Sequence, residues 1–382
     1  MKIVFLHRFK VVGGAERQLV ELACGLHERG HEVTLVTFYP GGVMLGDAGQ
    51  AGLRIVSLDK SGRWDVLPFV LRLIRRLRRE RADVVHGYLG MANALLVLTM
   101  PFHRAPVVWG VRASDIDISR YHRLARFDAW LEAKLSRFPS LIIANSHAGK
   151  AHAIERGFPA DRITVIPNGI DLDRFQRDEA GRTRIRAEWG VGEHERLIGR
   201  VARIDPQKDY PTFLRAAAIV ASQRMDVKFV LVGNDRYGSQ GELAALAGEL
   251  GLGERVIWAG QRTDMAAVHS AFDLCVSSSA YGEGTPNVLA EAMACGTPCV
   301  TTDAGDSAVT VGELGIVVPR GNPQALANGI NVALTRDHDP NALWSAVASR
   351  LSLERLVSSS ERALAGVIDT GRRAARRQEA RP

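Results

Sequence analysis

Cysteine is scarce in this sequence. Its 382 residues include four cysteines, and no two of them form a C-x-x-C pair. Structural metal sites and disulfide frameworks need such close and repeated spacings, so the sequence favours neither. It predicts free thiols buried in a reducing cytoplasm, at Cys24, Cys275, Cys295 and Cys299.

Long apolar runs are also missing. No window approaches the roughly 18 consecutive apolar residues that a membrane-spanning helix needs. Residues 2–7 carry one lysine and a short apolar run without a small-residue cleavage site, so we expect a first β-strand there and not a signal peptide. The 46% of hydrophobic and 24% of charged residues is typical of a globular protein, and the length allows two domains.

Acidic residues are under-represented in the first half of the chain. Residues 1–170 contain 24 Lys and Arg against 15 Asp and Glu, whereas the remainder contains 25 against 27. This imbalance predicts an anionic partner on the basic half. No aromatic stacking platform or base-reading motif accompanies the basic residues, so we expect no nucleic-acid partner.

Strand and helix patterns alternate along the whole chain. The first are a buried strand at Lys2–His7, a helix at Ala15–Arg29 and a strand at His31–Thr37. This order is typical of an α/β protein with a doubly wound parallel sheet. We expect the charged, glycine-bearing residues 172–194 to form a linker and residues 340–365 to form a helix.

The most informative stretch follows a strand predicted at Phe272–Val276. A loop rich in Ser and Gly carries Glu283, and Thr285 and Pro286 are placed as the N-cap and the first residue of a helix. A helix N-terminus at the carboxyl end of a strand favours anions, and carboxylates such as Glu283 and Glu291 accept hydrogen bonds from sugar hydroxyls. A nucleotide sugar fits both features. An ordinary strand–loop–helix unit with two solvated acids is the alternative.

Two cations follow an earlier predicted strand, Arg196–Val201. Arg203 and Lys208 lie in the loop after it, and an arginine fork with a lysine point charge suits a diphosphate. Arg200, inside the strand, competes with Arg203 for this role. The plainer alternative is that the loop cations are solvated.

Residues 283–298, which read E-G-x-P-N-V-L-x-E-A-M-A-x-G-x-P, resemble the signature of glycosyltransferase family 4. The resemblance implies a GT-B fold, two Rossmann-like doubly wound domains facing across a cleft, and retaining transfer from a nucleotide-diphosphate sugar. It places Glu283 on the donor sugar, Glu291 on the ribose, and Arg203 and Lys208 at the leaving diphosphate. The donor-binding residues that it implies between the two acids are Gly284, Thr285, Pro286, Asn287, Val288 and Leu289.

Shorter strings extend the resemblance. G-G-A-E, at Gly13 and Gly14, is similar to the family's loop against the donor diphosphate, although Gly-Gly alone is more often a tight turn. A-N-S at 144–146 and I-P-N-G-I-D at 166–171 are similar to further family strings. Arg262, after a strand predicted at 256–258, is assigned to the donor crevice, because ligands bind outside the carboxyl ends of parallel strands.

Arg112 departs from the family pattern. Many members have a histidine near the donor sugar at the end of this strand, where the present chain has Arg112. We expect Arg112 to contact the acceptor or the donor sugar, for instance by pairing with the phosphate of a lipid phosphate acceptor. A salt bridge to Asp115 or Asp117 is the structural alternative.

A strongly basic helix is predicted at Pro68–Ala82. Family members with lipid-linked acceptors resemble it, which implies docking on an anionic membrane surface, and a solvated basic face is the alternative. The arginines around its apolar stripe are Arg72, Arg75, Arg76, Arg78, Arg79 and Arg81, with Arg63 upstream. A later helix, Tyr121–Phe138, is expected to bury Phe127 and Trp130.

The prediction for the whole chain combines these parts. Residues 1–170 form an acceptor-binding domain, 171–350 a nucleotide-sugar-binding domain, 351–370 a helix that crosses back to the first domain, and 371–382 a disordered basic tail. We expect a glycosyltransferase of cell-envelope glycan synthesis, cytoplasmic or on the inner membrane face, with a lipid-linked or polysaccharide-precursor acceptor. No D-x-D motif stands beside the crevice and two cations can replace a metal, so no metal or cofactor is expected. A non-catalytic nucleotide-sugar-binding subunit and another GT-B enzyme, such as a sugar-nucleotide epimerase, are the alternatives.

Overall fold

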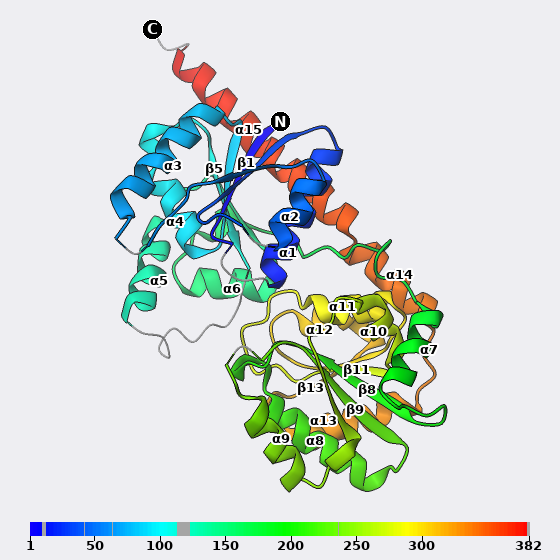
Figure 1. Ribbon diagram of the computed structural model, residues 1–382. Helices are drawn as coiled ribbons and strands as arrows, with labels where there is room; N and C mark the ends of the chain where they lie inside the picture. Colours follow the sequence, from blue (N-terminus) through cyan, green and yellow to red (C-terminus); the bar gives the residue numbers. More distant parts are fainter. Residues whose placement is uncertain (10–12, 42, 63, 113–122, 236, 380–382) are drawn as a thin grey trace. The chain divides into compact units, whose positions relative to one another are not determined.

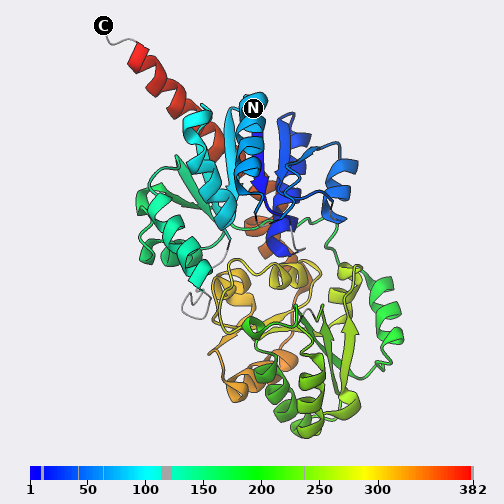
Figure 2. The ribbon, with the colours of Figure 1, turned by 60° about the vertical axis from the view of Figure 1, so that its left-hand side comes forward.

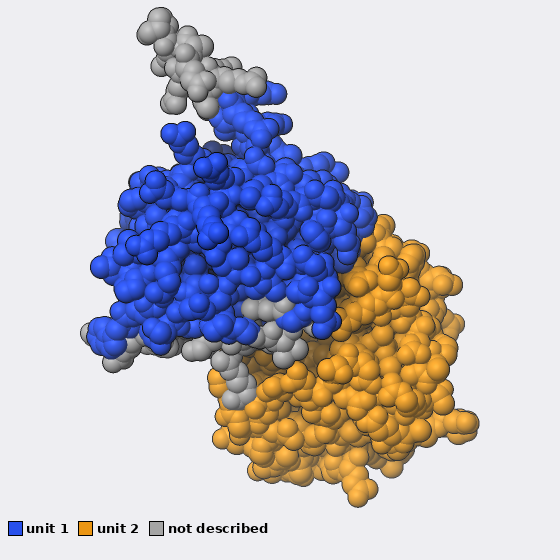
Figure 3. All heavy atoms as spheres, turned by 45° about the horizontal axis from the view of Figure 1, so that its top comes forward, with its two compact units in different colours: residues 1–169, 353–382 blue, residues 170–352 orange. Residues whose placement is uncertain are grey.

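The computed structural model describes residues 1–9, 13–41, 43–62, 64–112, 123–235 and 237–379. The chain divides into two compact units, which Figure 3 colours separately. Unit 1 consists of residues 1–169 and 353–382, and unit 2 of residues 170–352. Each unit is built around one parallel sheet with helices on both faces (Figures 1 and 2).

Unit 1 holds a seven-stranded parallel sheet among its described residues, in the order β3-β2-β1-β4-β5-β6-β7. The strands are β1 Lys2–His7, β2 Glu32–Thr37, β3 Arg54–Ser57, β4 Val84–Tyr88, β5 Val107–Val111, β6 Leu141–Ala144 and β7 Ile163–Val165. The helices are α1 Gly14–Glu28, α2 Val43–Gln50, α3 Val66–Glu80, α4 Gly90–Leu98, α5 Arg123–Leu135, α6 His147–Glu155 and α15 Leu353–Glu379.

The strands of unit 1 are apolar because both faces of the sheet are covered. Successive residues of β1 point to opposite faces. Ile3 and Phe5 join a core with α1, α2 and α15, whereas Val4 and Leu6 join a core with α3, α4 and α6. The last helix thus completes a core that the first helix begins.

Unit 2 holds a six-stranded parallel sheet among its described residues, in the order β10-β9-β8-β11-β12-β13. Its strands are β8 Arg196–Val201, β9 Val227–Val232, β10 Val256–Gly260, β11 Leu274–Ser277, β12 Cys299–Thr302 and β13 Ile316–Val318. Its helices are α7 Glu179–Glu188, α8 Tyr210–Gln223, α9 Gln240–Glu249, α10 Met265–Ala271, α11 Asn287–Ala294, α12 Ser307–Val311, α13 Pro323–Thr335 and α14 Pro340–Leu351. Single 3-10 turns occupy Met100–Phe102, Ala160–Arg162, Pro206–Lys208, Gly253–Arg255 and Gly312–Leu314.

Two apolar cores sandwich the sheet of unit 2. Leu197 of β8 lies in the core that includes α7, α10, α11, α12 and α14. Ile198, its neighbour, lies in the core that includes α8, α9 and α13. Figures 1 and 2 show α8, α9 and α13 together, apart from α10, α11 and α12. The three cysteines of this unit are buried and free, as expected.

The predicted linker is wrong in part, because residues 172–194 contain the helix α7. Asp178 caps this helix, since its Oδ1 accepts a hydrogen bond of 2.8 Å from the amide of Gly181. Arg182 and Arg186 then donate to the carboxylate of Asp273, at 2.8 and 2.9 Å. Charged residues that suggested a solvated linker are therefore paired with the body of unit 2.

Two further predictions about the C-terminal helices need correction. A helix over 340–365 is interrupted, because Ser352 takes an extended conformation between α14 and α15. The expected disorder after residue 370 is also wrong for residues 371–379, which continue α15 to Glu379. The segment is rich in alanine, arginine, glutamine and glutamate, which are good helix formers. Residues 380–382 lie outside the described residues.

Helix α5 presents its aromatic side chains to solvent, against expectation. Phe127 and Trp130 are 55% and 54% exposed, and their rings stack 5.7 Å apart. The packed face carries Glu132, whose carboxylate accepts hydrogen bonds from Arg156 at 2.9 Å and from Asn93 at 3.4 Å. These polar contacts orient the helix so that its aromatic residues face outward. No helix long and apolar enough to span a bilayer occurs in the described part of the chain.

A buried histidine makes unit 1 sensitive to acid. His86 in β4 is fully buried between Phe5 and Tyr88, and its two ring nitrogens have no hydrogen-bond partner among the described residues. Burial and the Arg112 guanidinium lower the pKa of His86 to about 3. Below about pH 6.5 the unfolded chain therefore takes up a proton that the folded state refuses, and the free energy of unfolding falls until about pH 3.

The free energy of unfolding should fall less steeply with decreasing pH in His86→Phe than in wild type. We expect the slope to be smaller by up to about 1.4 kcal/mol per pH unit between pH 6 and pH 4. At pH 7 the variant should stay within about 1.5 kcal/mol of wild type, because no hydrogen bond is lost and the ring is replaced by a ring. Urea unfolding followed at each pH measures both. The exposed His27→Gln variant is the control, and an unchanged pH slope in His86→Phe contradicts the account.

Candidate active site

The candidate residues lie at the carboxyl ends of parallel strands in both units. Ligands of doubly wound sheets bind at this edge, since the loops and helix N-termini there converge. The residues of each unit are described separately. Unit 2 carries most of the predicted donor residues, and unit 1 carries Arg112 together with the predicted donor residues Gly13 and Gly14.

An ion pair lies at the centre of the site in unit 2. Lys208 Nζ donates to Glu283 Oε1 at 2.5 Å, and Ser279 Oγ donates to the same oxygen at 2.6 Å. Lys208 belongs to the loop after β8, and Glu283 to the loop after β11. The structure thus brings together two predicted catalytic residues that are far apart in the sequence.

Burial and the neighbouring cations shift the pKa of Glu283 in opposite directions. Burial raises the pKa of this carboxyl, but Lys208, Ser279 and the Arg200 guanidinium outweigh that effect, so the pKa lies below its usual value. The side chain is therefore ionised at neutral pH although it is almost fully buried. A fixed charge next to a lysine is suited to orienting a polar ligand.

Arg200 and Arg203 have different environments. Arg200 is 1% exposed, lies 4.5 Å from the ring centroid of Tyr210, and donates to the backbone oxygen of Lys208. It holds the loop that carries Lys208. Arg203 is half-buried in that loop and has no hydrogen-bond or ion-pair partner among the described residues. Its guanidinium is available to a ligand, so Arg203 stays the predicted clamp residue.

The glycine-rich loop closes against its neighbours through tight backbone contacts. Gly305 has φ +59°, and a Cβ there would lie 2.1 Å from the carbonyl oxygen of Glu283. Gly282 has φ +76°, and a Cβ there would lie 2.7 Å from Gln207. A Cβ at position 305 would displace the backbone of Glu283, whereas at position 282 the Gln207 side chain could move away and it is the positive φ that favours glycine.

The helix after this loop begins later than predicted. Asn287, and not Pro286, is the first residue of α11, and Pro286 is its N-cap in place of Thr285. A proline at this position has no side-chain oxygen, so no side chain caps the helix. The first-turn backbone of α11, with Val288 and Leu289, still follows the loop directly, as a diphosphate site requires. Gly284 accepts a hydrogen bond from the amide of Asp306 at 3.1 Å.

Glu291 lies one turn further along α11. It is 4% exposed, and its Oε2 lies 3.5 Å from Nε2 of His269, which is fully buried. His269 was not identified from the sequence, because a lone histidine in an apolar helix carries no motif. It packs beside Glu291, and neither of its ring nitrogens has a hydrogen-bond partner among the described residues.

Arg262 is bound to carboxylates in the structure. Its guanidinium pairs with Glu188 of α7 at 2.5 Å and with Asp264 at 2.9 Å. These hydrogen bonds raise the pKa of Arg262. The predicted donor contact of Arg262 stays a prediction, and it requires the guanidinium to exchange one of these partners for the donor.

Arg112 occupies a buried position at the end of β5. It is 8% exposed, and its guanidinium carbon lies 4.1 Å from the ring centroid of Tyr88. Nε and Nη1 have no hydrogen-bond partner among the described residues. Burial lowers the pKa of Arg112, and also raises that of Tyr88 to about 12. The alternative partners Asp115 and Asp117 lie outside the described residues.

The glycine pair precedes α1 of the same unit. Gly13 is the N-cap of α1 and Gly14 its first residue, and no side chain caps the helix. Glu16 in the first turn lies 3.7 Å from Nε2 of His7, at the end of β1. A helix start and two titratable groups therefore meet at the carboxyl end of β1.

Comparison with known proteins identifies the family. Residues 12–174 match Glycosyltransferase Family 4, and residues 195–336 match Glycosyl transferases group 1. The chain belongs to glycosyltransferase family 4. The first of these matches covers most of unit 1, and the second lies within unit 2.

Relatives within curated proteins match part of their own length. D-inositol 3-phosphate glycosyltransferase of Mycobacterium marinum is 33% identical over 213 residues, which are 55% of this chain and 41% of that protein. The protein of the same name from Nocardia farcinica is 30% identical over 278 residues, 68% of this chain and 60% of that protein. The chain thus spans only part of the length of these relatives.

Solved structures agree over nearly the whole chain. HepE of Anabaena, in complex with UDP and glucose, is 25% identical with a TM-score of 0.84, over 96% of this chain and 100% of that one. The same protein in complex with UDP-glucose gives the same values. Like other members of glycosyltransferase family 4, the chain has the GT-B fold, with two Rossmann-like units.

A cavity that the sequence did not indicate completes the description of unit 1. It measures about 1070 Å³ and lies at the carboxyl ends of β1, β2 and β3. Aromatic side chains and cations line it, among them Phe9, Tyr39, Arg8 and Lys60. These residues belong to loops without a family motif, so no sequence pattern marked them.

We expect the Lys208–Glu283 pair to be strongly coupled. Lys208→Met leaves a buried carboxylate unpaired and should lower the free energy of unfolding of unit 2 by about 3 kcal/mol. Adding Glu283→Gln should recover at least about 1 kcal/mol of that loss. Urea unfolding of wild type, both single variants and the double variant gives the coupling energy.

The matched control is the more exposed pair of Lys228 and Glu195, 3.0 Å apart in the same unit. Its coupling energy should stay below about 1 kcal/mol. Additive losses at Lys208 and Glu283, with no recovery in the double variant, contradict the role of this pair.

Proposed function

We propose that this chain transfers a sugar from a nucleotide-diphosphate donor to an acceptor hydroxyl or phosphate, with retention at the anomeric carbon. The observation that carries the proposal is the Lys208–Glu283 ion pair at the carboxyl edge of the sheet in unit 2, with Lys208 in the same loop as Arg203, which has no ion-pair or hydrogen-bond partner among the described residues. Family membership and the UDP-bound structures of HepE support a UDP-linked donor. NMR of the product's anomeric proton distinguishes retention from inversion.

The chemical task is to stabilise the leaving nucleotide as the glycosidic bond breaks. Lys208 and Arg203 neutralise the growing charge on the diphosphate, and the amides at the start of α11 donate to its oxygens. Glu283 accepts from hydroxyls of the sugar, and Glu291 from those of the ribose. Since these cations take the role of a divalent ion, we propose that transfer needs no metal.

The acceptor is proposed to carry an anionic group held by Arg112. A buried guanidinium with two N–H-bearing atoms unbonded among the described residues favours a phosphate or carboxylate ligand. The aromatic and cationic cavity at the carboxyl ends of β1, β2 and β3, on the same edge of the sheet as Arg112, suits a sugar ring attached to such a group. These features favour a lipid-linked or polysaccharide-precursor acceptor of cell-envelope glycan synthesis.

A lipid-linked acceptor implies work at the inner face of a membrane. Helix α3 supports this proposal, because Leu67 and Leu71 at its start are 68% and 41% exposed, and Arg75, Arg78 and Arg79 are exposed further along. An apolar and basic helix face binds anionic bilayers. Co-sedimentation with phosphatidylglycerol vesicles, and its loss in Leu67→Asp/Leu71→Asp, tests this localisation.

The donor class is open to a thermal-shift experiment. A nucleotide present at 100 times its Kd adds about 2.7 kcal/mol to the free energy of unfolding, which raises the Tm by a few degrees. In a panel of UDP-, GDP-, ADP- and TDP-sugars, we expect the UDP series to stabilise the protein, with or without EDTA. Glu291→Ala should lose the shift, whereas Glu249→Ala on the exposed face of α9 should keep it.

Stabilisation by another nucleotide series overturns the choice of UDP. Stabilisation that vanishes with EDTA overturns the metal-independent account. A shift without any release of UDP in the presence of membrane lipids favours a non-catalytic nucleotide-sugar-binding subunit.

We expect the loss of the Arg112 charge to reduce sugar transfer without destabilising the protein. Arg112→Met removes a buried cation with two nitrogens unbonded among the described residues, so we expect the free energy of unfolding to stay the same or rise by about 1 kcal/mol. Release of UDP from UDP-glucose with a lipid extract as acceptor should fall at least about tenfold, the effect of one charged hydrogen bond. A stability loss above about 1 kcal/mol with unchanged transfer assigns Arg112 a structural role instead.

A further inference from the structure

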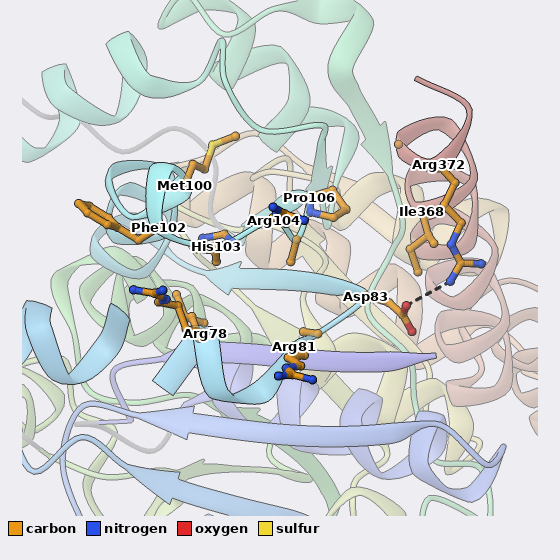
Figure 4. A pocket seen from close by; sticks show the side chains of 14 residues that line it. Arg78, Arg81, Asp83, Met100, Phe102, His103, Arg104, Pro106, Ile368 and Arg372 are labelled. Carbon is orange, nitrogen blue, oxygen red and sulfur yellow. Dashed lines mark hydrogen bonds and ion pairs between the residues drawn. The ribbon is translucent and has the colours of Figure 1, made fainter. Parts of the chain in front are cut away.

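A second cavity lies at the opposite edge of the sheet in unit 1. It measures about 790 Å³ and is bounded by the end of α3, the loop that precedes β5, and α15 (Figure 4). Asp83, which precedes β4, and Pro106, which precedes β5, line it, so it lies at the amino ends of these strands. Five-residue strands are about 16 Å long. The cavity, here called the arginine pocket, is therefore separate from Tyr88 and Arg112.

Positive charge dominates the arginine pocket. Four arginines line it, with one carboxylate, Asp83. Figure 4 shows two of them at the end of α3, one before β5, and one on α15 that reaches Asp83. They are Arg78, Arg81, Arg104 and Arg372.

The one carboxylate is already engaged within the protein. Asp83 Oδ2 accepts from the backbone amide of Lys2 at 2.8 Å, and Oδ1 accepts from Arg372 Nη2 at 3.2 Å. Arg78, Arg81 and Arg104 have no ion-pair or hydrogen-bond partner within the described ranges. The pocket thus has three exposed cations without a counter-charge among the described residues.

The same helix shows how arginines are otherwise satisfied. Arg72 pairs with Asp65, and Arg76 pairs with the buried Glu80 at 3.0 Å. Arg81 is instead held at the end of α3 with φ +48° and ψ +43°. Glycine is favoured in this left-handed conformation, and a side chain is disfavoured there. An arginine at position 81 therefore destabilises the fold relative to a glycine.

The remaining walls of the pocket are mostly apolar, and His103 also lines it. Leu77, Met100, Pro106 and Ile368 contribute to them, and Phe102 stands 52% exposed at the rim. Guanidinium groups bind phosphate through paired hydrogen bonds. The combination therefore fits a phosphate ester with an apolar body and not a free sugar.

We propose that the arginine pocket binds a phosphomonoester carried on an apolar group, outside the donor and acceptor sites. The ligand's phosphate lies between Arg81, Arg104 and Arg78, and its apolar part lies against Met100 and Phe102. A lipid head group and a free phosphorylated metabolite share this chemistry. The proposal holds whether or not the chain transfers sugar.

Isothermal titration of the full chain tests the proposal, with UDP in excess so that a donor site is not available to the probe. The probes are dihexanoyl phosphatidic acid below its micelle concentration, and glycerol 3-phosphate. We expect the phosphatidic acid to bind, and Arg104→Gln and Arg81→Gly each to raise its Kd at least about tenfold, the effect of one charge-assisted hydrogen bond. Arg79→Gln, an equal change of charge at an exposed residue of α3 outside the pocket, should raise it less than about twofold.

Arg81→Gly also separates binding from folding. Because glycine suits the backbone conformation of residue 81, this variant should unfold at the same or a higher urea concentration than wild type. Weaker binding in a protein of equal stability assigns the residue to a ligand.

The two probes then distinguish the source of the phosphate. Equal affinity for glycerol 3-phosphate, with the same loss in Arg104→Gln, identifies a free metabolite. Binding of the lipid probe alone, together with sedimentation on phosphatidic acid vesicles, identifies a membrane lipid. The proposal is overturned if neither probe binds at about 1 mM, or if Arg79→Gln weakens binding as much as the pocket variants do.

Discussion

The buried ion pair between Lys208 and Glu283 is the interaction on which the candidate site depends. Two charges removed from water destabilise a fold unless they meet each other and are hydrogen-bonded. Around this pair, Ser278 Oγ donates to the backbone oxygen of Asp209 at 2.8 Å, and the amide of Ala280 donates to that of Gln207 at 2.9 Å. The two loops are thus bound to each other along their length, and the charges are fixed before any ligand arrives.

This arrangement limits which residues the two loops can hold. Glycine at 282 and 305 is favoured by positive φ angles, and at 305 a Cβ would also displace the backbone of Glu283. The Arg200 guanidinium lies over the ring of Tyr210 and donates a hydrogen bond to the backbone oxygen of Lys208. These residues touch no ligand in the proposed mechanism. They hold the lysine and the glutamate where a diphosphate and a sugar would meet them.

The sequence predicted the fold and the family well, because strand periodicity and a sixteen-residue motif are local signals, and the roles of the two acids in that motif stay predictions. It placed the start of α11 one residue early, since a proline at the N-cap mimics one at the first helical position. It failed at Phe127 and Trp130, because the buried contacts of Glu132 outweigh the aromatic pattern of α5. The loop cavity and His269 carried no pattern at all. Their positions arise only when distant segments meet.

Arginine shows the limit of such predictions most clearly. Arg262 neutralises two carboxylates, and Arg200 lies over an aromatic ring as a brace. Arg112 is also buried, and its Nε and Nη1 have no hydrogen-bond partner among the described residues; Arg200 Nε lacks one as well, but that guanidinium donates to the backbone oxygen of Lys208. A sequence motif does not distinguish these arginines. The surroundings of each guanidinium determine the free energy of burying it. A buried guanidinium whose nitrogens are satisfied is part of the fold, whereas one whose nitrogens are not satisfied gains from an anion. The number of unbonded nitrogens in each buried guanidinium, and not the residue type, is therefore the basis for proposing Arg112 as a ligand contact and Arg200 as a structural residue.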